Sequence, residues 1–218
     1  MPPPPRRVCR PNCCLRILFP VRHKRACRRL TSLPTTDVPA SHATKRLLSL
    51  PEYRAAKRIS VYLSMPAGEI STAPIVRDAL AQGKTVFIPF TYEPNVQRDG
   101  QPKSIMDMVE LRSINDFESF QPDRWNIPIP SRDSLSSRAN CFGDKGLTHG
   151  KEIRAGDEHG LDLIVMPGMA FDGSFGRLGH GKGYYDYFLR RCQASSQMPF
   201  RGKNYWYFFF VIDRKSVV

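Results

Sequence analysis

The stretch that decides the fold is RISVYLSMPAGEISTAPIVRDALAQGKTVFIPF, residues 58–90. It begins and ends with short apolar runs, rich in β-branched and aromatic residues, that are typical of buried strands. Between these runs, apolar residues recur at helical spacing over residues 75–80, and Gly83 supplies a helix stop. The stretch therefore predicts a strand–helix–strand unit whose two parallel strands are buried on both faces of a sheet.

Strand-like segments continue on the C-terminal side of this unit. Residues 105–112 (IMDMVELR) alternate like a strand, and residues 125–130 (WNIPIP) are predicted to be extended because they contain two prolines. Residues 161–168 (LDLIVMPG) form the strongest strand pattern in the chain. Residues 131–160, rich in serine, glycine and charge, are interpreted as a surface insertion without a core-forming pattern. Three large residues are expected to pack in the strands rather than to line a substrate: Met106, Met108 and Trp125.

Length and composition limit the class of protein. The chain has 218 residues, 41% of them hydrophobic, which suits one α/β domain with its own core. The formal net charge is +13, but residues 1–36 hold nine basic residues and no acidic one. Over the rest of the chain 24 basic residues face 20 acidic ones, an excess of only +4 (24 − 20), so no nucleic-acid partner is expected. No apolar run reaches the ~18 residues of a membrane helix.

The basic leader of residues 1–36 leaves two interpretations open. An arginine-rich, acid-free segment is typical of a mitochondrial transit peptide, but its prolines interrupt any long helix, which favours a disordered or wrongly assigned leader. Its four cysteines form no CxxC pair, so unpaired thiols of a reducing compartment fit better than a zinc site. A cytoplasmic protein is expected, with the mitochondrion as the alternative.

The loop GRLGHGKGYYD, residues 176–186, carries the strongest chemical signal. It follows a buried strand and opens a helical pattern, and ligands bind at such places in open α/β sheets. Gly176, Gly181 and Lys182 reproduce the GxxxxGK of a P-loop, but the motif needs Ser or Thr at the next position for magnesium, and Gly183 stands there. The glycines still allow backbone N–H groups to converge on an anion at the start of a helix.

Charged and aromatic side chains complete this loop. Arg177 can fork onto phosphate oxygens, and Lys182 adds a compact positive charge. Asp186, in the first turn of the expected helix, can supply an oxygen ligand to Mg²⁺ in place of the missing hydroxyl. Of Tyr184 and Tyr185, one is expected to bury against the sheet and the other to present its ring and hydroxyl to a ligand.

At these residues the sequence resembles the 5-formyltetrahydrofolate cyclo-ligase family. The resemblance lies in MPGMAFDGSFGRLGHGKGYYDYFL (residues 166–189), LPEYRAAKRISVYLSMPAGEI (residues 50–70) and GKTVFIPF (residues 83–90), and covers about residues 41–200. It implies an open, mostly parallel sheet with helices on both faces, a three-layer αβα, Rossmann-like fold similar to that of CoA transferases. It also implies an ATP- and Mg²⁺-dependent ligase that converts 5-formyltetrahydrofolate to 5,10-methenyltetrahydrofolate, with release of ADP and phosphate. A monomer that binds this small-molecule folate is expected.

The resemblance assigns roles to individual residues. It implies that ATP is bound by Lys24, Arg28, Arg177, Leu178, Gly179, His180, Gly181, Lys182, Gly183, Tyr184 and Tyr185. It implies that the folate contacts Leu63, Glu69, His180, Gly181, Lys182, Gly183 and Tyr184. It gives catalytic roles to Arg177, Lys182 and Tyr184, and a metal-ligating role to Asp186. A carboxylate at Glu69 suits the N–H and amino donors of a pterin, but an exposed acid before a helix is the alternative there, as a core position is for Leu63.

The sequence departs from the family pattern near both ends. Lys24 and Arg28 keep the four-residue spacing of the family's ATP-binding cations, but they lie several residues closer than usual to Ser41. After about Gly202 the resemblance stops, so the C-terminal part of the family fold is expected to be missing, through truncation or intron read-through. The apolar run of residues 205–212 could mimic the missing strand.

The expected organisation has three parts. Residues 1–36 form the leader, residues 37–202 the cyclo-ligase domain, and residues 203–218 an atypical tail. The expected function is ATP-dependent cyclisation of the folate, and a folate or nucleotide binder without turnover is the alternative. A nucleic-acid binder would rest on the leader alone. A small-molecule kinase is disfavoured because the sequence offers no evident catalytic base.

Overall fold

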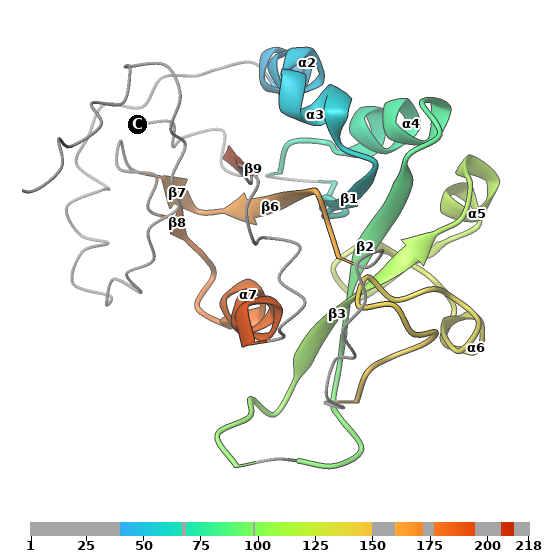
Figure 1. The fold of residues 1–218 in the computed structure, drawn as a ribbon, viewed down its shortest axis with the longest axis vertical. Coiled ribbons are helices and arrows are strands. Elements are labelled where there is room, and N and C mark those ends of the chain that lie inside the picture. Colours follow the sequence, from blue (N-terminus) through green and yellow to red (C-terminus); the bar gives the residue numbers. More distant parts are fainter. Residues whose placement is uncertain are drawn as a thin grey trace, which may run out of the picture.

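Within the part of the chain that the structure describes, five strands form one sheet in the order β3-β2-β1-β6-β9 (Figure 1). The structure, a computed structural model, describes residues 40–66, 69–97, 99–149, 160–171, 177–194 and 206–211. The strands are β1 (Arg58–Val61), β2 (Thr85–Tyr92), β3 (Ile105–Leu111), β6 (Leu163–Gly168) and β9 (Trp206–Val211). Neighbours pair in parallel, except that β3 is antiparallel to β2. The predicted open, mostly parallel sheet is confirmed.

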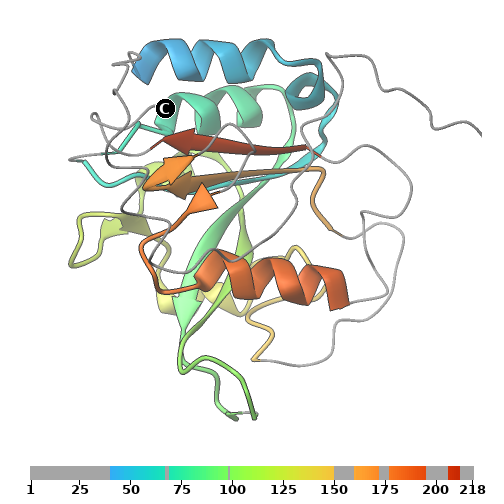
Figure 2. The same ribbon diagram turned by 90° about the vertical axis from the view of Figure 1, so that its left-hand side faces the viewer.

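Helices cover both faces of this sheet. Figure 2 shows α2 (Ala40–Ser49) and α4 (Ala73–Ala81) on one side of the strands and α7 (Tyr184–Ala194) on the other. Helix α4 joins β1 to β2 as predicted, and the residue that ends it, Gly83, has a positive φ of 70°. The remaining helices are α3 (Pro51–Ala55), α5 (Ile114–Glu118) and α6 (Arg132–Leu135). None of the helices in the described ranges is long and apolar enough to cross a membrane.

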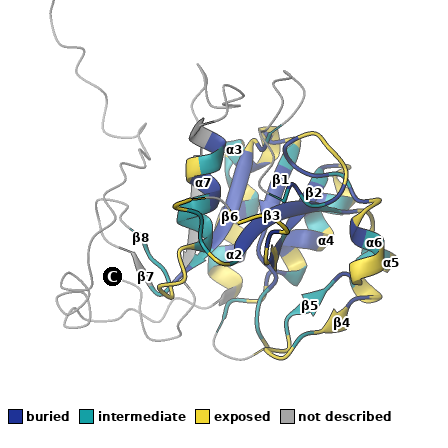
Figure 3. Cartoon of the chain, turned by 90° about the horizontal axis from the view of Figure 1, so that it is seen from below, coloured by how far each residue is buried: buried dark blue, intermediate teal, exposed yellow. Residues whose placement is uncertain are grey.

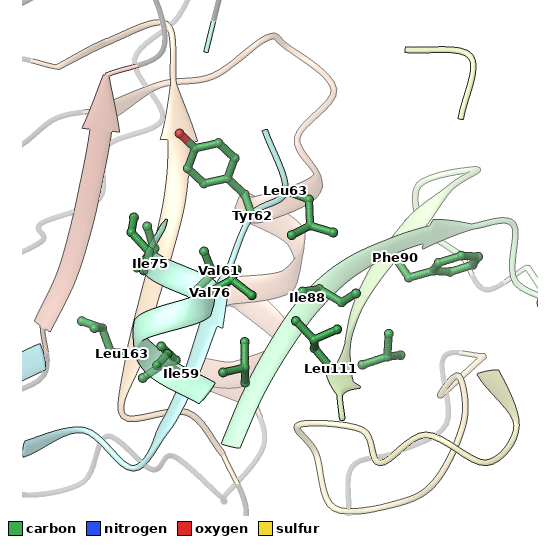
Figure 4. Close-up of a cluster of buried hydrophobic side chains, with 14 of the residues drawn as sticks. Ile59, Val61, Tyr62, Leu63, Ile75, Val76, Ile88, Phe90, Leu111 and Leu163 are labelled. Atoms are coloured by element: carbon green, nitrogen blue, oxygen red, sulfur yellow. The ribbon is translucent and has the colours of Figure 1, made fainter. Parts of the chain in front are cut away.

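Two hydrophobic clusters fill the spaces between the layers. Successive residues of a strand point to opposite faces, so β2 contributes Val86 and Ile88 to one cluster and Phe87 to the other. The first cluster lies under α4 (Figure 4), and the second lies under α7. Met106 and Met108 are buried in the second cluster, which confirms their interpretation as strand packing. Figure 3 shows the buried residues concentrated in the sheet.

Residues 131–149 are not the surface insertion that their composition predicted. Cys141 donates its N–H to the carbonyl of Met108 at 3.0 Å, and the carbonyl of Ala139 accepts from Glu110 at 2.8 Å, so this segment covers the outer edge of β3. The segment also buries Leu135 and Phe142 in the core. The prediction was wrong because isolated apolar side chains and main-chain hydrogen bonds leave no periodic pattern in a sequence.

Residues 125–130 are only partly extended. Short strands β4 (Gln121–Pro122) and β5 (Pro128–Ile129) pair with each other, and Trp125 lies in the turn between them. The Asp123 side chain accepts hydrogen bonds from the N–H groups of Trp125 and Ile127, which sets this turn and overrides the extended tendency before a proline. Trp125 is 60% exposed, so its interpretation as strand packing was wrong.

A buried ion pair fastens the last turn of α7 to the edge of the sheet. Asp107 of β3 is fully buried and lies 2.7 Å from the guanidinium group of Arg191. It also accepts hydrogen bonds from Tyr92, from Asn140 and from both the N–H and the hydroxyl of Thr148. Burial alone would lower the pKa of Arg191, but the Asp107 carboxylate raises it above the ordinary value. Arg191 is therefore charged and fully paired.

Candidate functional site

The candidate site lies where the strand order of the sheet reverses. Strand β1 has β2, the next parallel strand in the chain, on one side and β6 on the other. The segments that leave the carboxyl ends of β1 and β6 therefore diverge from a switch point, which is the usual ligand site of such sheets. These segments are residues 62–72 after β1 and residues 169–183 after β6. They contain most of the predicted site residues.

The glycine loop connects β6 to α7, as the sequence predicted. A short antiparallel hairpin, β7 (Ala170–Phe171) and β8 (Arg177–Leu178), comes first and was not predicted. Gly181 and Gly183 then have positive φ angles of 86° and 71°, and no atom of the described residues lies within 4 Å of the place where a Cβ would stand on either. Only glycine adopts this backbone readily, and the open space around it leaves room for a ligand to approach the main chain.

The loop leads directly into the first turn of α7. The carbonyl of Gly183 accepts the helical hydrogen bond from the N–H of Tyr187 at 2.9 Å. The first N–H groups of a helix have no partner within the helix and carry a partial positive charge. The arrangement therefore suits an anion, as the sequence predicted, and phosphate is the anion for which such loops are used.

Arg177 is enclosed by the loop rather than extended into solvent. Its Nη1 donates to the carbonyl of Pro167 at 2.9 Å, and its Nη2 lies 3.2 Å from Oδ1 of Asp186. The guanidinium group also lies 5.5 Å from the ring centre of Tyr185, and a Cβ on Gly179 would stand only 3.0 Å from Nη1. Arg177 thus joins the end of β6, the glycine loop and the start of α7.

The remaining polar side chains of the loop are available to a ligand. Lys182 and His180 are both exposed. Asp186 is 38% exposed on its side chain and offers a hard carboxylate oxygen, the ligand type that Mg²⁺ prefers. Within the described ranges, no group of three His, Cys, Asp or Glu side chains could hold a metal ion. One carboxylate beside bound phosphate is a common way to hold Mg²⁺, so the residues present fit that ion.

Glu69 faces this loop from the segment after β1. Its carboxylate accepts the N–H of Met65 at 2.7 Å. Burial raises the pKa of the Glu69 carboxyl, and the Met65 N–H and His180 of the glycine loop offset part of that rise. The structure therefore brings Glu69 and the loop together, as the site prediction requires. Because Glu69 is half-buried, its alternative interpretation as an exposed acid before a helix was wrong.

The tyrosines at the start of α7 connect the loop to the core. Tyr185 packs against both hydrophobic clusters, and burial raises the pKa of its hydroxyl. Tyr184 packs against the second cluster only. Tyr62, which the sequence analysis did not select, is buried at the end of β1 and donates its hydroxyl to the carbonyl of Ile70. Its position next to Leu63 was the signal that could have identified it.

Among the other predicted residues, Leu63 lies in the core and two cations lie outside the described part of the chain. Leu63 is 6% exposed and belongs to the first hydrophobic cluster, as Figure 4 shows, so its core interpretation is confirmed. Lys24 and Arg28 lie outside the described residues. The sequence analysis also missed the pairing of Arg177 with Asp186, because they lie nine positions apart and no helical or strand spacing relates them.

The fold and the loop together define an open α/β protein with a glycine loop at its switch point. Comparison with known proteins narrows this class. The sequence profile of the 5-formyltetrahydrofolate cyclo-ligase family matches residues 21–202. The chain therefore belongs to the 5-formyltetrahydrofolate cyclo-ligase family.

Two curated relatives agree with this assignment. The chain is 35% identical over 150 residues to 5-formyltetrahydrofolate cyclo-ligase of Mus musculus, an alignment that covers 68% of this chain and 61% of the relative. It is 31% identical over 150 residues to the probable 5-formyltetrahydrofolate cyclo-ligase of Schizosaccharomyces pombe, covering 69% of this chain and 60% of the relative. The chain thus spans about three fifths of the length of these curated relatives. A solved 5,10-methenyltetrahydrofolate synthetase from Mycoplasma pneumoniae matches with a TM-score of 0.38 and 16% identity, over 88% of this chain and 96% of that one.

Proposed function

We propose that this protein is an ATP-dependent enzyme that cyclises 5-formyltetrahydrofolate to 5,10-methenyltetrahydrofolate and releases ADP and phosphate. The observation that carries the proposal is the glycine loop, in which Gly181 and Gly183 hold a positive-φ backbone at the start of α7 and His180 lies close enough to Glu69 to act on the charge of its carboxylate. Membership of the family supports the choice of substrates. The proposal covers residues 37–202 as the catalytic domain.

In the proposed reaction, the protein mainly positions the two substrates and neutralises charge. In the proposed sequence of steps, the formyl oxygen attacks the γ-phosphorus of ATP and ADP leaves. N10 of the folate then attacks the activated carbon and loses its proton, the C–O bond to phosphate breaks, and the phosphate leaves with that proton, which forms the methenyl bridge. Both steps develop or move negative charge on phosphate oxygens, and fixed donors stabilise that charge best. No covalent enzyme intermediate is needed.

The triphosphate side of the site is assigned to the loop of residues 177–185. The backbone N–H groups around Gly181 and Gly183 would hold phosphate oxygens, and the exposed Lys182 would neutralise charge on the transferred group. Arg177 belongs to the same loop, and its side chain is 11% exposed. Asp186 would hold Mg²⁺, which supplies charge neutralisation on the phosphates when it is bound.

The folate side of the site is assigned to Glu69 and to the face of the loop opposite it. Oε2 of Glu69 already accepts the Met65 N–H, which fixes the orientation of the carboxylate, and the remaining lone pairs suit the N–H and amino donors of a pterin. His180 and Tyr184 would complete this side. With these assignments the formyl group would lie between the Glu69 carboxylate and the phosphate-binding loop.

The direct test mixes the full chain with 5-formyltetrahydrofolate, ATP and Mg²⁺ and follows the absorbance of the methenyl product. We expect the absorbance to grow only when all three are present, with one ADP formed per product. Binding of nucleotide and folate without growth of absorbance would favour a binder without turnover. Absence of nucleotide binding would refute the proposal.

The proposal includes a monomer without nucleic-acid or membrane partners, placed in the cytoplasm with the mitochondrion as the alternative. It rests on the small charge excess outside residues 1–36 and on the leader's composition. Sedimentation of the full chain tests the monomer. Microscopy of a C-terminally tagged chain with and without residues 1–36 tests the compartment, because a transit peptide would be needed for mitochondrial import.

A further inference from the structure

The two side chains assigned to phosphate and to metal are bound to each other in this structure. Arg177 and Asp186 form an ion pair at 3.2 Å, with one guanidinium nitrogen facing one carboxylate oxygen. The pair is uneven in burial, because the side chain of Arg177 is 11% exposed whereas that of Asp186 is 38% exposed. Asp186 therefore occupies the position at Arg177 where a phosphate would bind. Arg177 likewise occupies the position at Asp186 where Mg²⁺ would bind.

The surroundings hold Arg177 next to the loop independently of Asp186. The Pro167 carbonyl accepts from Nη1, the Tyr185 ring lies beneath the guanidinium group, and Gly179 has no side chain that would push it away. The Pro167 carbonyl and the Tyr185 ring remain partners of Arg177 when Asp186 leaves, and a phosphate oxygen can take the place of the carboxylate. Phosphate is a stronger bidentate partner for arginine than a single carboxylate oxygen at 3.2 Å.

We propose that Arg177 and Asp186 form an exchange pair, which couples the binding of the metal ion to the binding of the nucleotide. When both ligands arrive together, Asp186 passes from Arg177 to the metal and Arg177 passes from Asp186 to a phosphate oxygen, so no charge is left unpaired. When the metal ion binds alone, Asp186 must leave Arg177, which loses its partner. When the nucleotide binds alone, its phosphate competes with Asp186 for Arg177. Bound nucleotide must then raise the affinity for the metal ion by the same factor by which the bound metal ion raises the affinity for the nucleotide. This inference rests on the proposed function and adds a binding rule to it.

The first experiment measures nucleotide affinity without metal. The full chain and its Asp186→Asn variant are titrated by calorimetry with the non-hydrolysable β,γ-imido analogue of ATP, in EDTA and in Mg²⁺. Removing the carboxylate frees Arg177 for phosphate, so we expect the variant to bind the metal-free analogue about tenfold more tightly than the wild type, as one charge-assisted hydrogen bond gives. Its gain in affinity on adding Mg²⁺ should largely disappear.

A matched control separates this effect from net charge. Asp133→Asn removes one negative charge at an exposed position of α6, and we expect it to bind the analogue as the wild type does. If Asp186→Asn instead leaves the metal-free affinity unchanged or weakens it, the exchange pair is refuted while the proposed function stands. If the wild type binds the analogue under neither condition, both are refuted.

The second experiment works from the other side of the pair and needs no nucleotide. Arg177→Gln removes the cation that holds Asp186, so the variant should bind Mn²⁺ alone more tightly than the wild type, measured by electron paramagnetic resonance of free Mn²⁺. An affinity for Mn²⁺ that is equal to or below that of the wild type would refute the exchange. Thermal melting of each variant confirms that it is folded at the temperature of the titrations, and this arm decides the question if Asp186→Asn does not fold.

Discussion

Helix α7 carries an ion pair at each end, and the two pairs are constructed differently. At its last turn, Arg191 meets a fully buried carboxylate at 2.7 Å, and Asp107 also accepts from Tyr92, Asn140 and Thr148. At its first turn, Asp186 meets Arg177 at 3.2 Å through one hydrogen bond and keeps part of its surface in solvent. The last-turn pair is saturated with partners, whereas Arg177 is the one side-chain partner of Asp186 among the described residues.

The difference indicates which end of the helix is fixed and which end can change partners. A buried carboxylate with all its lone pairs satisfied has no capacity for a ligand, and removing its cation leaves an uncompensated charge. A half-exposed carboxylate with one partner can be rehydrated or take a metal ion at small cost. Helix α7 is therefore anchored at its C-terminal end and presents its N-terminal end to the site.

The largest expected effect comes from breaking the anchor. Arg191→Met leaves Asp107 charged and buried, so we expect the free energy of unfolding to fall by about 3–5 kcal/mol. Arg190→Met is the matched control, because Arg190 is the neighbouring residue and is exposed. Chemical denaturation of both variants checks the prediction. A loss below about 1 kcal/mol in Arg191→Met would mean that the remaining donors of Asp107 suffice and that the helix end is not anchored by this pair.

The next largest effect concerns the ligand-facing end and leaves stability unchanged. Lys182 is exposed, so Lys182→Ala should not shift the melting temperature, but it should weaken nucleotide binding by about 1.5–3 kcal/mol, as expected for the loss of a charge-assisted hydrogen bond to phosphate. Lys45→Ala removes an equally exposed lysine from α2 and serves as the control. Calorimetry with nucleotide and Mg²⁺ measures the difference. Wild-type affinity in Lys182→Ala would remove the residue from the proposed phosphate site.

A smaller effect tests the contrast between the two ion pairs directly. Asp186→Asn removes the first-turn pair, and because its carboxylate is part-exposed we expect the free energy of unfolding to change by less than about 1 kcal/mol. Denaturation alongside Arg191→Met makes the comparison. If the two variants lose similar stability, the first-turn pair is also an anchor and the distinction between the helix ends fails.

The smallest expected effect is a gain in stability at the proposed folate carboxylate. Burial raises the pKa of Glu69, so its charged form is disfavoured in the folded protein, and stability decreases as the pH rises through this raised pKa. Glu69→Gln should therefore melt higher than the wild type at pH 7, by at most about 3 °C, the shift that ~1 kcal/mol produces at this size. The difference should vanish below pH ~4, where the carboxyl is protonated in both the folded and unfolded states.

A control for this last prediction uses a carboxylate with the opposite pKa shift. Burial opposes ionisation of Asp116 as well, but Arg138 and the Arg112 N–H hold its pKa below the usual value. Asp116→Asn should therefore lower the melting temperature at pH 7, and its cost should shrink as the pH falls through that lowered pKa. Equal responses of the two variants to pH would contradict the assigned environment of Glu69.

The periodic parts of the fold were predictable from the sequence, and its irregular parts were not. The β1–α4–β2 unit, β6 and α7 follow local apolar patterns, and the apolar run of residues 205–212 does supply β9 next to β6. The cover over β3 depends on main-chain hydrogen bonds of residues 139–141, which any sequence can make. Trp125 was misplaced because a single side chain, Asp123, turned the backbone.

One part of the candidate site could likewise be predicted from the sequence, and another part could not. Its glycine loop could be found from the spacing of glycines and cations, because positive-φ backbone requires particular residues at particular positions. The pairing of Arg177 with Asp186 and the orientation of Glu69 by Met65 could not, since they depend on where β1 and β6 place their loops in space. The sequence therefore indicates the groups of the site, and the fold determines which of them contact one another.

The cover over β3 also has a consequence for how this chain behaves among other copies of itself. A bare outer strand offers unpaired main-chain groups on which a second polypeptide can add a strand, the first step of many aggregates. Here the bridge between Val109 and Asn140 occupies the middle of that edge. Shortening residues 131–149 would expose this edge of β3. We therefore expect a shortened version of this protein to precipitate more readily.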